Sequence, residues 1–132
     1  MDNVIVISVV VPFILFSLCV GISVLLAQKK DAQLSARLPD TLSYKWGFFL
    51  GYSGIITAVI ATAAGLIVMA AGIWKDWLPI AIAYAVATGI ASYGVLARRR
   101  WGWLLHIPLS LNMGLWAFNS VYVHNRWREF PW

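Results

Sequence analysis

Four long apolar runs divide the chain, and short polar segments separate them. The runs cover residues 4–27, 46–74, 78–97 and 101–123. An α-helix rises about 1.5 Å per residue, so the first run, about 24 residues long, extends roughly 36 Å. That length exceeds the hydrocarbon core of a bilayer, which is about 30 Å thick. The pattern therefore predicts an all-α integral membrane bundle of four transmembrane helices, formed as one domain over residues 1–132.

The segments outside these runs predict how the helices begin, connect and end. Pro12 lies in the middle of the first run and predicts a kink there. Residues 28–45 are the only long polar stretch, and they fit a short interfacial helix and a plain loop equally well. Residues 74–77 make a connection short enough to pair the second and third helices as an antiparallel hairpin. Residues 124–132 are expected to form an aromatic tail outside the bundle.

The composition excludes most classes of soluble protein. Hydrophobic residues make up 61% of the 132 residues and charged residues 11%, whereas soluble domains have roughly 45–50% and about 25%. A small soluble domain has too much surface for so many apolar side chains. A soluble enzyme, a disordered chain and a coiled coil are therefore not expected. The eight tryptophans stand mostly beside charged residues at the ends of the runs, where indole rings meet lipid headgroups.

The basic residues predict an orientation. The net charge is +5, with ten Lys and Arg against five Asp and Glu. Seven of the ten lie in residues 28–45 and 98–100, and the other three are Lys75, Arg126 and Arg128. Because basic residues collect in cytoplasmic loops, we expect both basic segments in the cytoplasm and both termini outside, across a bacterial inner membrane. The runs between the basic clusters need lipid, so a nucleic-acid partner is not expected.

Small residues recur at every seventh position of the second run. They are Gly51, Ala58, Gly65 and Gly72. A stripe of small side chains lets another helix approach closely in a membrane. The spacing therefore predicts a seam for helix packing along this run.

His106 is the only ionisable residue within an apolar run. If residues 101–123 form one helix, His106 and Ser110 lie on one stripe, and Asn112 and Asn119 lie on a second. These four residues are the candidates for a solute contact or for hydrogen bonds between helices. His106 has three interpretations: an interhelical hydrogen bond, an axial ligand of haem or a chlorophyll-type pigment, and a proton relay or base.

Other chemistry has little support in the sequence. Two His, one Cys and three Met are scattered along the chain, so no metal site is expected. The serines have no matched acid and base, so we do not expect an enzyme. No resident cofactor is expected beyond the haem or pigment that His106 leaves open.

Basic and aromatic residues at the helix ends form two further candidate sites. The first is Arg98, Arg99 and Arg100 with Trp101 and Trp103. It predicts a topology anchor, a site for anionic lipid headgroups with the two indoles as platforms, or a surface for an acidic partner. The second consists of Trp127, Phe130 and Trp132 in the tail. These rings are expected to lie on the outer membrane face or on a partner subunit.

Three functions are compatible with this pattern. The first is a non-catalytic structural or assembly subunit of a larger membrane complex or of a homo-oligomer. The second is an oligomeric channel or carrier for a small or lipidic solute, and the third is a haem- or pigment-binding subunit that uses His106. The expected partners are the lipid bilayer, anionic lipids among them, and other membrane subunits or further copies of the chain.

Overall fold

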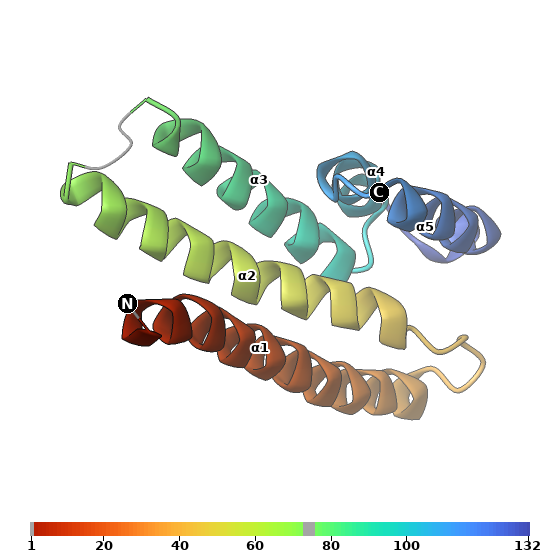
Figure 1. The fold of residues 1–132 in the computed structure, drawn as a ribbon. Coiled ribbons are helices and arrows are strands. Elements are labelled where there is room, and N and C mark those ends of the chain that lie inside the picture. Colours follow the sequence, from red (N-terminus) through yellow and green to blue (C-terminus); the bar gives the residue numbers. More distant parts are fainter. Residues whose placement is uncertain (1, 73–75) are drawn as a thin grey trace.

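Most of the residues that the structure describes are helical. The computed structural model describes residues 2–72 and 76–132, with side chains from residue 7 onward. Its elements are α1 (Asp2–Arg37), α2 (Lys45–Ala70), α3 (Leu78–Leu96), α4 (Arg100–Leu109), α5 (Met113–Arg126) and the 3-10 turn η1 (Trp127–Glu129). These residues include no strand, so the all-α prediction is confirmed. Figure 1 shows α1, α2 and α3 as long rods, with the shorter α4 and α5 beside the end of α3.

Three of the described helices, α1, α2 and α3, are long and apolar enough to cross a membrane. The other two are much shorter, since α4 has 10 residues and α5 has 14. At about 1.5 Å per residue they extend roughly 15 and 21 Å, less than the hydrocarbon core of about 30 Å. The chain has the helices of a multi-pass membrane protein, but the count of four spanning helices is not confirmed.

The predicted fourth helix is interrupted between residues 109 and 113. Leu111 has a φ of 49°, in the left-handed region that a branched side chain rarely adopts. Asn112 then caps a new helix, because its side-chain oxygen accepts a hydrogen bond from the Leu115 nitrogen at 3.1 Å. Pro108, in the last turn of α4, has no N–H to continue the ladder. One continuous helix over residues 101–123 is therefore a wrong prediction.

The helices α4 and α5 form a hairpin that starts and ends at the same end of the molecule. The Arg100 nitrogen, at the start of α4, donates to the Pro131 carbonyl beyond η1 at 3.0 Å. At the other end of α4, the Leu109 carbonyl accepts from the Tyr84 hydroxyl. Tyr84 lies twelve residues before Leu96 in α3, which is roughly 18 Å along the helix. The tip of the α4–α5 hairpin therefore lies beside the middle of α3.

The end where the hairpin starts is called the basic end. It contains the connections at residues 38–44 and 97–99, and the Arg126 guanidinium donates there to the Ser43 carbonyl at 2.7 Å. The C-terminal residues lie at the same end, since an Arg99 guanidinium nitrogen donates to the Trp132 carbonyl at 2.6 Å. The expectation that the tail and the basic segments lie on opposite faces is therefore wrong.

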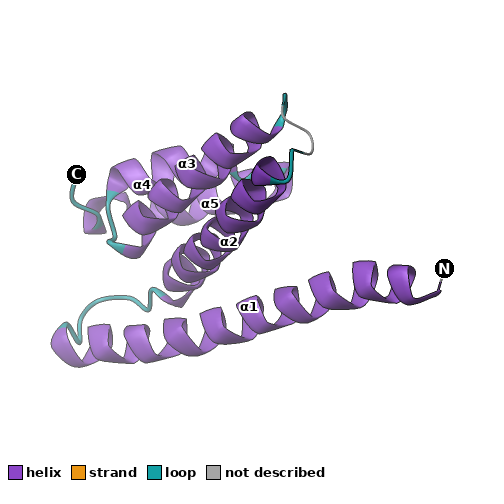
Figure 2. Ribbon diagram, turned by 90° about the vertical axis from the view of Figure 1, so that its left-hand side faces the viewer, coloured by secondary structure: helices purple, strands orange, loops and turns teal. Residues whose placement is uncertain are grey.

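The long polar stretch belongs largely to α1, which continues unbroken through Pro12 and ends at Arg37. It is neither a separate interfacial helix nor a plain loop over its whole length. The Asp31 carboxylate, near this end of α1, accepts from the Ser43 hydroxyl at 2.8 Å and from the Tyr44 nitrogen at 2.6 Å. These bonds tie α1 to the start of α2, and Figure 2 shows the two helices diverging toward the N-terminus.

The predicted packing seam is shorter than expected. The helix α2 ends at Ala70, and Gly72 follows it with a φ of 76°. A residue in this conformation closes a helix, a role for which glycine is suited. Gly72 is therefore a turn residue and not part of the seam. The predicted connection at residues 74–77 lies partly outside the described residues, but α2 and α3 are antiparallel neighbours (Figure 1).

The buried core of the protein lies at the basic end. Its large side chains are Tyr44, Phe48, Val95, Trp103 and Phe130. The Tyr44 hydroxyl donates to the Val95 carbonyl at 2.7 Å and accepts from the Trp103 indole at 2.9 Å. Burial raises the pKa of the Tyr44 hydroxyl well above its usual value, so the group keeps the proton that it donates. This core holds α2, α3, α4 and the C-terminal residues together.

Candidate functional site

A cavity of about 700 Å³ lies where α1, α2, α3 and the α4–α5 hairpin meet. Most of its walls are apolar, with Leu15 and Phe16 from α1, Ile60 from α2 and Leu115 from α5. A few polar side chains interrupt these walls: Cys19, Ser53, Thr57, Thr88, His106 and Ser110. A mostly apolar cavity with a few polar groups is the usual form of a small-molecule site.

His106 is the polar residue of this cavity with the most unused hydrogen-bonding capacity. Its side chain is only 7% exposed, and its Nδ1 has no hydrogen-bond partner among the described residues. The ring of Trp103 meets it edge to face, with 6.3 Å between the ring centroids. A buried polar atom without a partner costs free energy comparable to a lost hydrogen bond. Because the His106 side chain also lines the cavity, its imidazole is the group that the polar part of a molecule in the cavity would meet.

Gly54 of α2 makes room for the Ser92 side chain of α3, close to the imidazole of His106 in α4. A Cβ at this position would lie 2.8 Å from the Ser92 Cβ and 4.0 Å from His106 Nε2. The Ser92 hydroxyl is fully buried and also lacks a partner among the described residues. Two side chains with an unpaired polar atom thus lie close to one glycine of the cavity wall.

Three of the four hydroxyls of the cavity already donate their protons to backbone carbonyls, and the fourth, that of Thr57, lies 3.7 Å from the Cys19 sulfur. Thr88 donates to the Tyr84 carbonyl at 2.9 Å, and Ser110 donates to the Ile107 carbonyl at 2.8 Å. Ser53 donates to the Leu50 carbonyl at 3.3 Å. Such bonds within a helix leave only the weaker acceptor side of each hydroxyl free. The polar preference of the cavity therefore depends mainly on His106.

The break after α4 separates the residues that were predicted to share polar stripes. His106 and Ser110 both line the cavity. Asn112 is exposed at the hairpin tip, where it caps α5. Asn119 is fully buried nearer the basic end, and its side-chain oxygen accepts from the Trp46 indole at 2.8 Å. Because the helix is interrupted at residues 110–112, the regular helical rotation of about 100° per residue cannot relate the side chains of α4 to those of α5.

The small residues of α2 face α3. Added Cβ atoms at Gly51 and Gly65 would each lie 2.8 Å from the nearest α3 side-chain atom, on Leu96 and Ile82 respectively. Ala58 is buried, and its Cβ would lie 3.0 Å from a Cβ added at Gly89. The helices α2 and α3 thus approach closely along these three positions.

Trp103 and Phe130 are not available to lipid headgroups or to a partner. Trp103 is 0% exposed and Phe130 is 1% exposed, because both rings pack in the core beside Tyr44. The predicted roles of Trp103 as an interfacial platform and of Phe130 as a partner contact are therefore wrong. The hydrophobic contribution of a ring buried within its own chain outweighs its preference for the interface.

The other residues of the two aromatic-basic groups lie against one another. The Arg100 guanidinium lies over the rings of Trp127 and Trp132, at 5.0 and 5.3 Å from their centroids. Its Nε also donates to the Trp127 carbonyl at 3.2 Å. Trp101 is half-buried beside Gly94. The tail therefore folds back on the start of α4, and Trp132 remains exposed.

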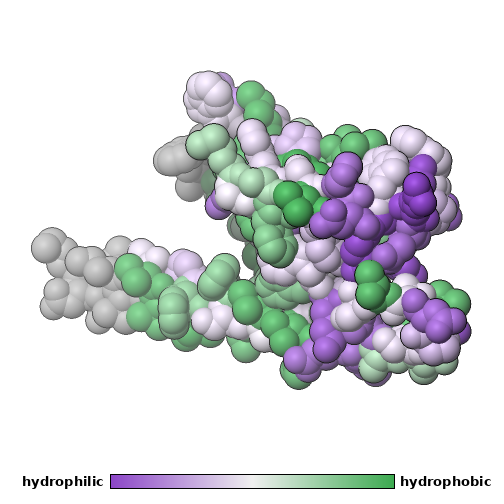
Figure 3. All heavy atoms as spheres, turned by 90° about the vertical axis from the view of Figure 1, so that its right-hand side faces the viewer, coloured by the Kyte–Doolittle hydropathy of each residue, from purple (hydrophilic) through white to green (hydrophobic). Residues whose placement is uncertain are grey.

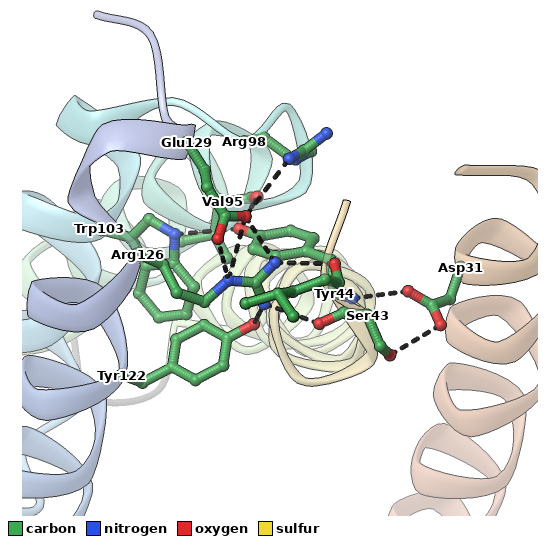
Figure 4. A network of polar contacts seen from close by, with 10 residues as sticks. Asp31, Ser43, Tyr44, Val95, Arg98, Trp103, Tyr122, Arg126 and Glu129 are labelled. Atoms are coloured by element: carbon green, nitrogen blue, oxygen red, sulfur yellow. Dashed lines mark hydrogen bonds and ion pairs between the residues drawn. The ribbon is translucent and has the colours of Figure 1, made fainter. Parts of the chain in front are cut away.

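A second polar cluster, which the sequence did not predict, lies at the basic end (Figure 4). The Arg126 guanidinium donates to the Leu42 and Ser43 carbonyls and forms an ion pair with Glu129 at 2.7 Å. It also donates to the Tyr122 hydroxyl and lies 5.4 Å from the centroid of the Tyr44 ring. The spacing of Arg126 and Glu129 on one helical face was the available signal. The cluster holds the α4–α5 hairpin to the connection between α1 and α2.

No known protein family, curated protein or solved structure matches the chain. Within the described part of the chain, no three His, Cys, Asp or Glu side chains are grouped so that they could hold a metal ion.

Proposed function

We propose that this protein is a membrane carrier that binds a small, mostly apolar molecule with one hydrogen-bonding group. The observation that carries the proposal is the buried imidazole of His106, whose Nδ1 has no hydrogen-bond partner among the described residues and which lines a cavity whose other walls are mainly apolar. In such a cavity, burial of the apolar part of the ligand supplies affinity, and the imidazole selects a ligand whose polar group can form a hydrogen bond with it. This proposal is a more specific form of the channel or carrier function that the sequence predicts as one of three possibilities.

The arrangement of α1 supports a lipidic solute. Its residues Leu15, Phe16, Cys19 and Val20 form one wall of the cavity. Beyond that wall α1 diverges from α2, so the space between the two helices widens toward the N-terminus (Figure 2). The α1 side chains in this part are apolar and exposed, as Figure 3 shows along the arm that projects from the molecule. A molecule dissolved in the bilayer would thus reach the cavity between α1 and α2.

The proposed topology has three spanning helices and one re-entrant hairpin. Nine of the ten Lys and Arg lie at the basic end, namely Lys29, Lys30, Arg37, Lys45, Arg98, Arg99, Arg100, Arg126 and Arg128. By the positive-inside rule this end faces the cytoplasm of a bacterial inner membrane. The α4–α5 hairpin then enters and leaves the membrane from the cytoplasmic side, and the N-terminus lies outside. Backbone without regular hydrogen bonds is tolerated at that depth where it lines a protein cavity.

The proposal predicts that a bound molecule depends on His106. We expect that the wild-type protein, purified in mild detergent, retains a bound small molecule. Native mass spectrometry should show this molecule as an adduct on the protein. Replacing His106 with Phe keeps a ring of similar shape and removes both nitrogens, so binding should weaken about tenfold, the value of one buried hydrogen bond. Ala61→Phe fills the cavity from α2 and should also remove the adduct.

Two matched variants control this experiment. His124→Phe makes the same substitution at an exposed residue of α5 that does not line the cavity, and Ala64→Phe does so on an exposed face of α2. Both should retain the adduct. The proposal is wrong if wild type carries no adduct, or if all four variants bind it as wild type does. A visible absorption spectrum of the same sample identifies an adduct that is haem or a pigment.

A second candidate is the structural or assembly subunit expected from the sequence. The exposed apolar side chains of α1 between residues 7 and 18 favour it, because such a face packs against lipid or against another membrane helix. The same purification distinguishes the two roles. A second membrane protein recovered at fixed stoichiometry, with no bound small molecule, would favour the subunit.

A further inference from the structure

A second, smaller pocket lies at the basic end, outside the proposed carrier site. Its volume is about 150 Å³, and it lies between the end of α1, the start of α2 and the end of α3. Three cationic side chains line it: Lys30, Arg37 and Arg98. The rest of its wall consists of Gln33, Leu34, Phe48, Leu96 and Ala97. No acidic residue lines this pocket, so three positive charges converge on a small space, and only a long ion pair from Arg98 to Glu129, at 3.8 Å, offsets one of them.

The nearby carboxylates are engaged elsewhere. Asp31 is buried and accepts hydrogen bonds from the Ser43 hydroxyl and the Tyr44 nitrogen. Glu129 pairs with Arg126 at 2.7 Å and reaches only Nη2 of Arg98, at 3.8 Å. The Nε of Arg98 is buried and has no hydrogen-bond partner among the described residues. Arg98 therefore brings to the pocket a positive charge that the nearby carboxylates offset only weakly.

The backbone fixes Arg98 in this place at some cost. Its φ is 57°, in the left-handed region, which is unfavourable for a residue with a side chain. The turn is held by hydrogen bonds from the Arg98 nitrogen to the Val95 carbonyl at 3.0 Å and from the Arg99 nitrogen to the Gly94 carbonyl at 2.9 Å. The guanidinium also lies 5.5 Å from the centroid of the Tyr44 ring. The cation is thus positioned by the fold and is not a freely moving surface charge.

We propose that this pocket binds the phosphate of an anionic phospholipid. The pocket lies where α1, α2 and α3 pass from apolar to polar sequence, which is the level of lipid headgroups in a membrane. Figure 3 shows hydrophilic residues gathered at this end of the molecule, next to the apolar body. Basic pockets between membrane helices on the cytoplasmic side suit such headgroups. The apolar side chains of Leu34, Phe48 and Leu96 can contact the acyl chains of a phospholipid, and a free phosphate has no such apolar part.

The test measures lipid affinity of the full-length protein after delipidation in detergent. The protein is titrated with phosphatidylglycerol, with phosphatidylcholine of the same acyl chains, and with inorganic phosphate. Native mass spectrometry measures how much of each ligand binds, and the shift in melting temperature measures how far it stabilises the protein. We expect phosphatidylglycerol to bind and stabilise wild type and the other two to have little effect. The double variant Lys30→Gln/Arg37→Gln removes two exposed cations of the pocket without touching the core, so affinity should fall about thirtyfold.

The matched control is the double variant Lys29→Gln/Lys45→Gln, which removes the same charge from two exposed residues outside the pocket. It should keep affinity within about threefold of wild type, because Lys29 and Lys45 do not line the pocket and cannot contact a phosphate bound in it. Each single variant, Lys30→Gln and Arg37→Gln, should weaken binding by an intermediate amount. Equal losses in both double variants, or equal binding of the two lipids, would overturn the proposal. Stabilisation by inorganic phosphate equal to that by phosphatidylglycerol would overturn the choice of a lipid.

Discussion

Replacing Arg126 with Ala should destabilise the protein by about 3 kcal/mol, the lower end of the range for removing one partner of a buried ion pair, because the remaining Glu129 is partly exposed to solvent. The Arg126 side chain is only 7% exposed, and its guanidinium saturates the Leu42 and Ser43 carbonyls and the Glu129 carboxylate. Without it these acceptors lose their donor, and the α4–α5 hairpin loses its attachment to the α1–α2 connection. Tryptophan fluorescence during heating should show a midpoint lower by about 10 °C or more.

Arg128→Ala is the control for this variant. Arg128 lies two residues further on, is exposed, and makes none of these bonds. Its replacement removes the same charge, so its melting temperature should stay within about 2 °C of wild type. A similar loss in both variants would mean that net charge, and not the buried cluster, stabilises this end of the protein.

The second large effect is expected at Gly102, where α3 and α4 touch backbone to backbone. A Cβ at Gly102 would overlap the carbonyl carbon of Gly94 and the nitrogen of Val95, which cannot rotate away as a side chain can. Gly102→Ala must therefore push α4 from α3 and disturb the packing of Trp103. Overpacking of a core costs about 1–3 kcal/mol and more when backbone must move. We expect a loss of about 3 kcal/mol, again measured by thermal unfolding in detergent.

Gly21→Ala makes the same substitution in a helix without the steric conflict. No heavy atom outside the helix lies within 4 Å of an added Cβ at Gly21. Because Ala favours the helix more than Gly does, this variant should be as stable as wild type or slightly more stable. Equal stability of the Gly21→Ala and Gly102→Ala variants would contradict the close contact between α3 and α4.

Hydropathy was sufficient to predict the long helices. The apolar runs of α1, α2 and α3 are too long for any soluble fold of this size, and their helical state follows from the need to satisfy every backbone group in lipid. His106 was also identifiable, because an ionisable residue within an apolar run is costly and rarely accidental. Its neighbours in space, Gly54 and Ser92, were not, since they come from two other helices.

The break between α4 and α5 was not predictable from hydropathy, because the apolar run continues through it. Leu111 gives no sign in the sequence that it adopts a left-handed conformation. Asn112 was the usable signal, since Asn is a favoured helix cap and Pro108 precedes it by four residues. The burial of Trp103 and Phe130 was hidden for a different reason. An aromatic ring beside an arginine looks the same in sequence whether it meets lipid or its own core.

In the proposed topology the C-terminal helices return to the side of the membrane from which they enter, because the cavity around His106 requires the hairpin tip to lie beside α1, α2 and α3. Reporter fusions to the C-terminus of the full chain in a bacterial host test this directly. A green fluorescent protein fusion, which fluoresces only in the cytoplasm, should be bright, and an alkaline phosphatase fusion, active only in the periplasm, should be inactive. An inactive fluorescent fusion with an active phosphatase would place the C-terminus outside and contradict the re-entrant hairpin.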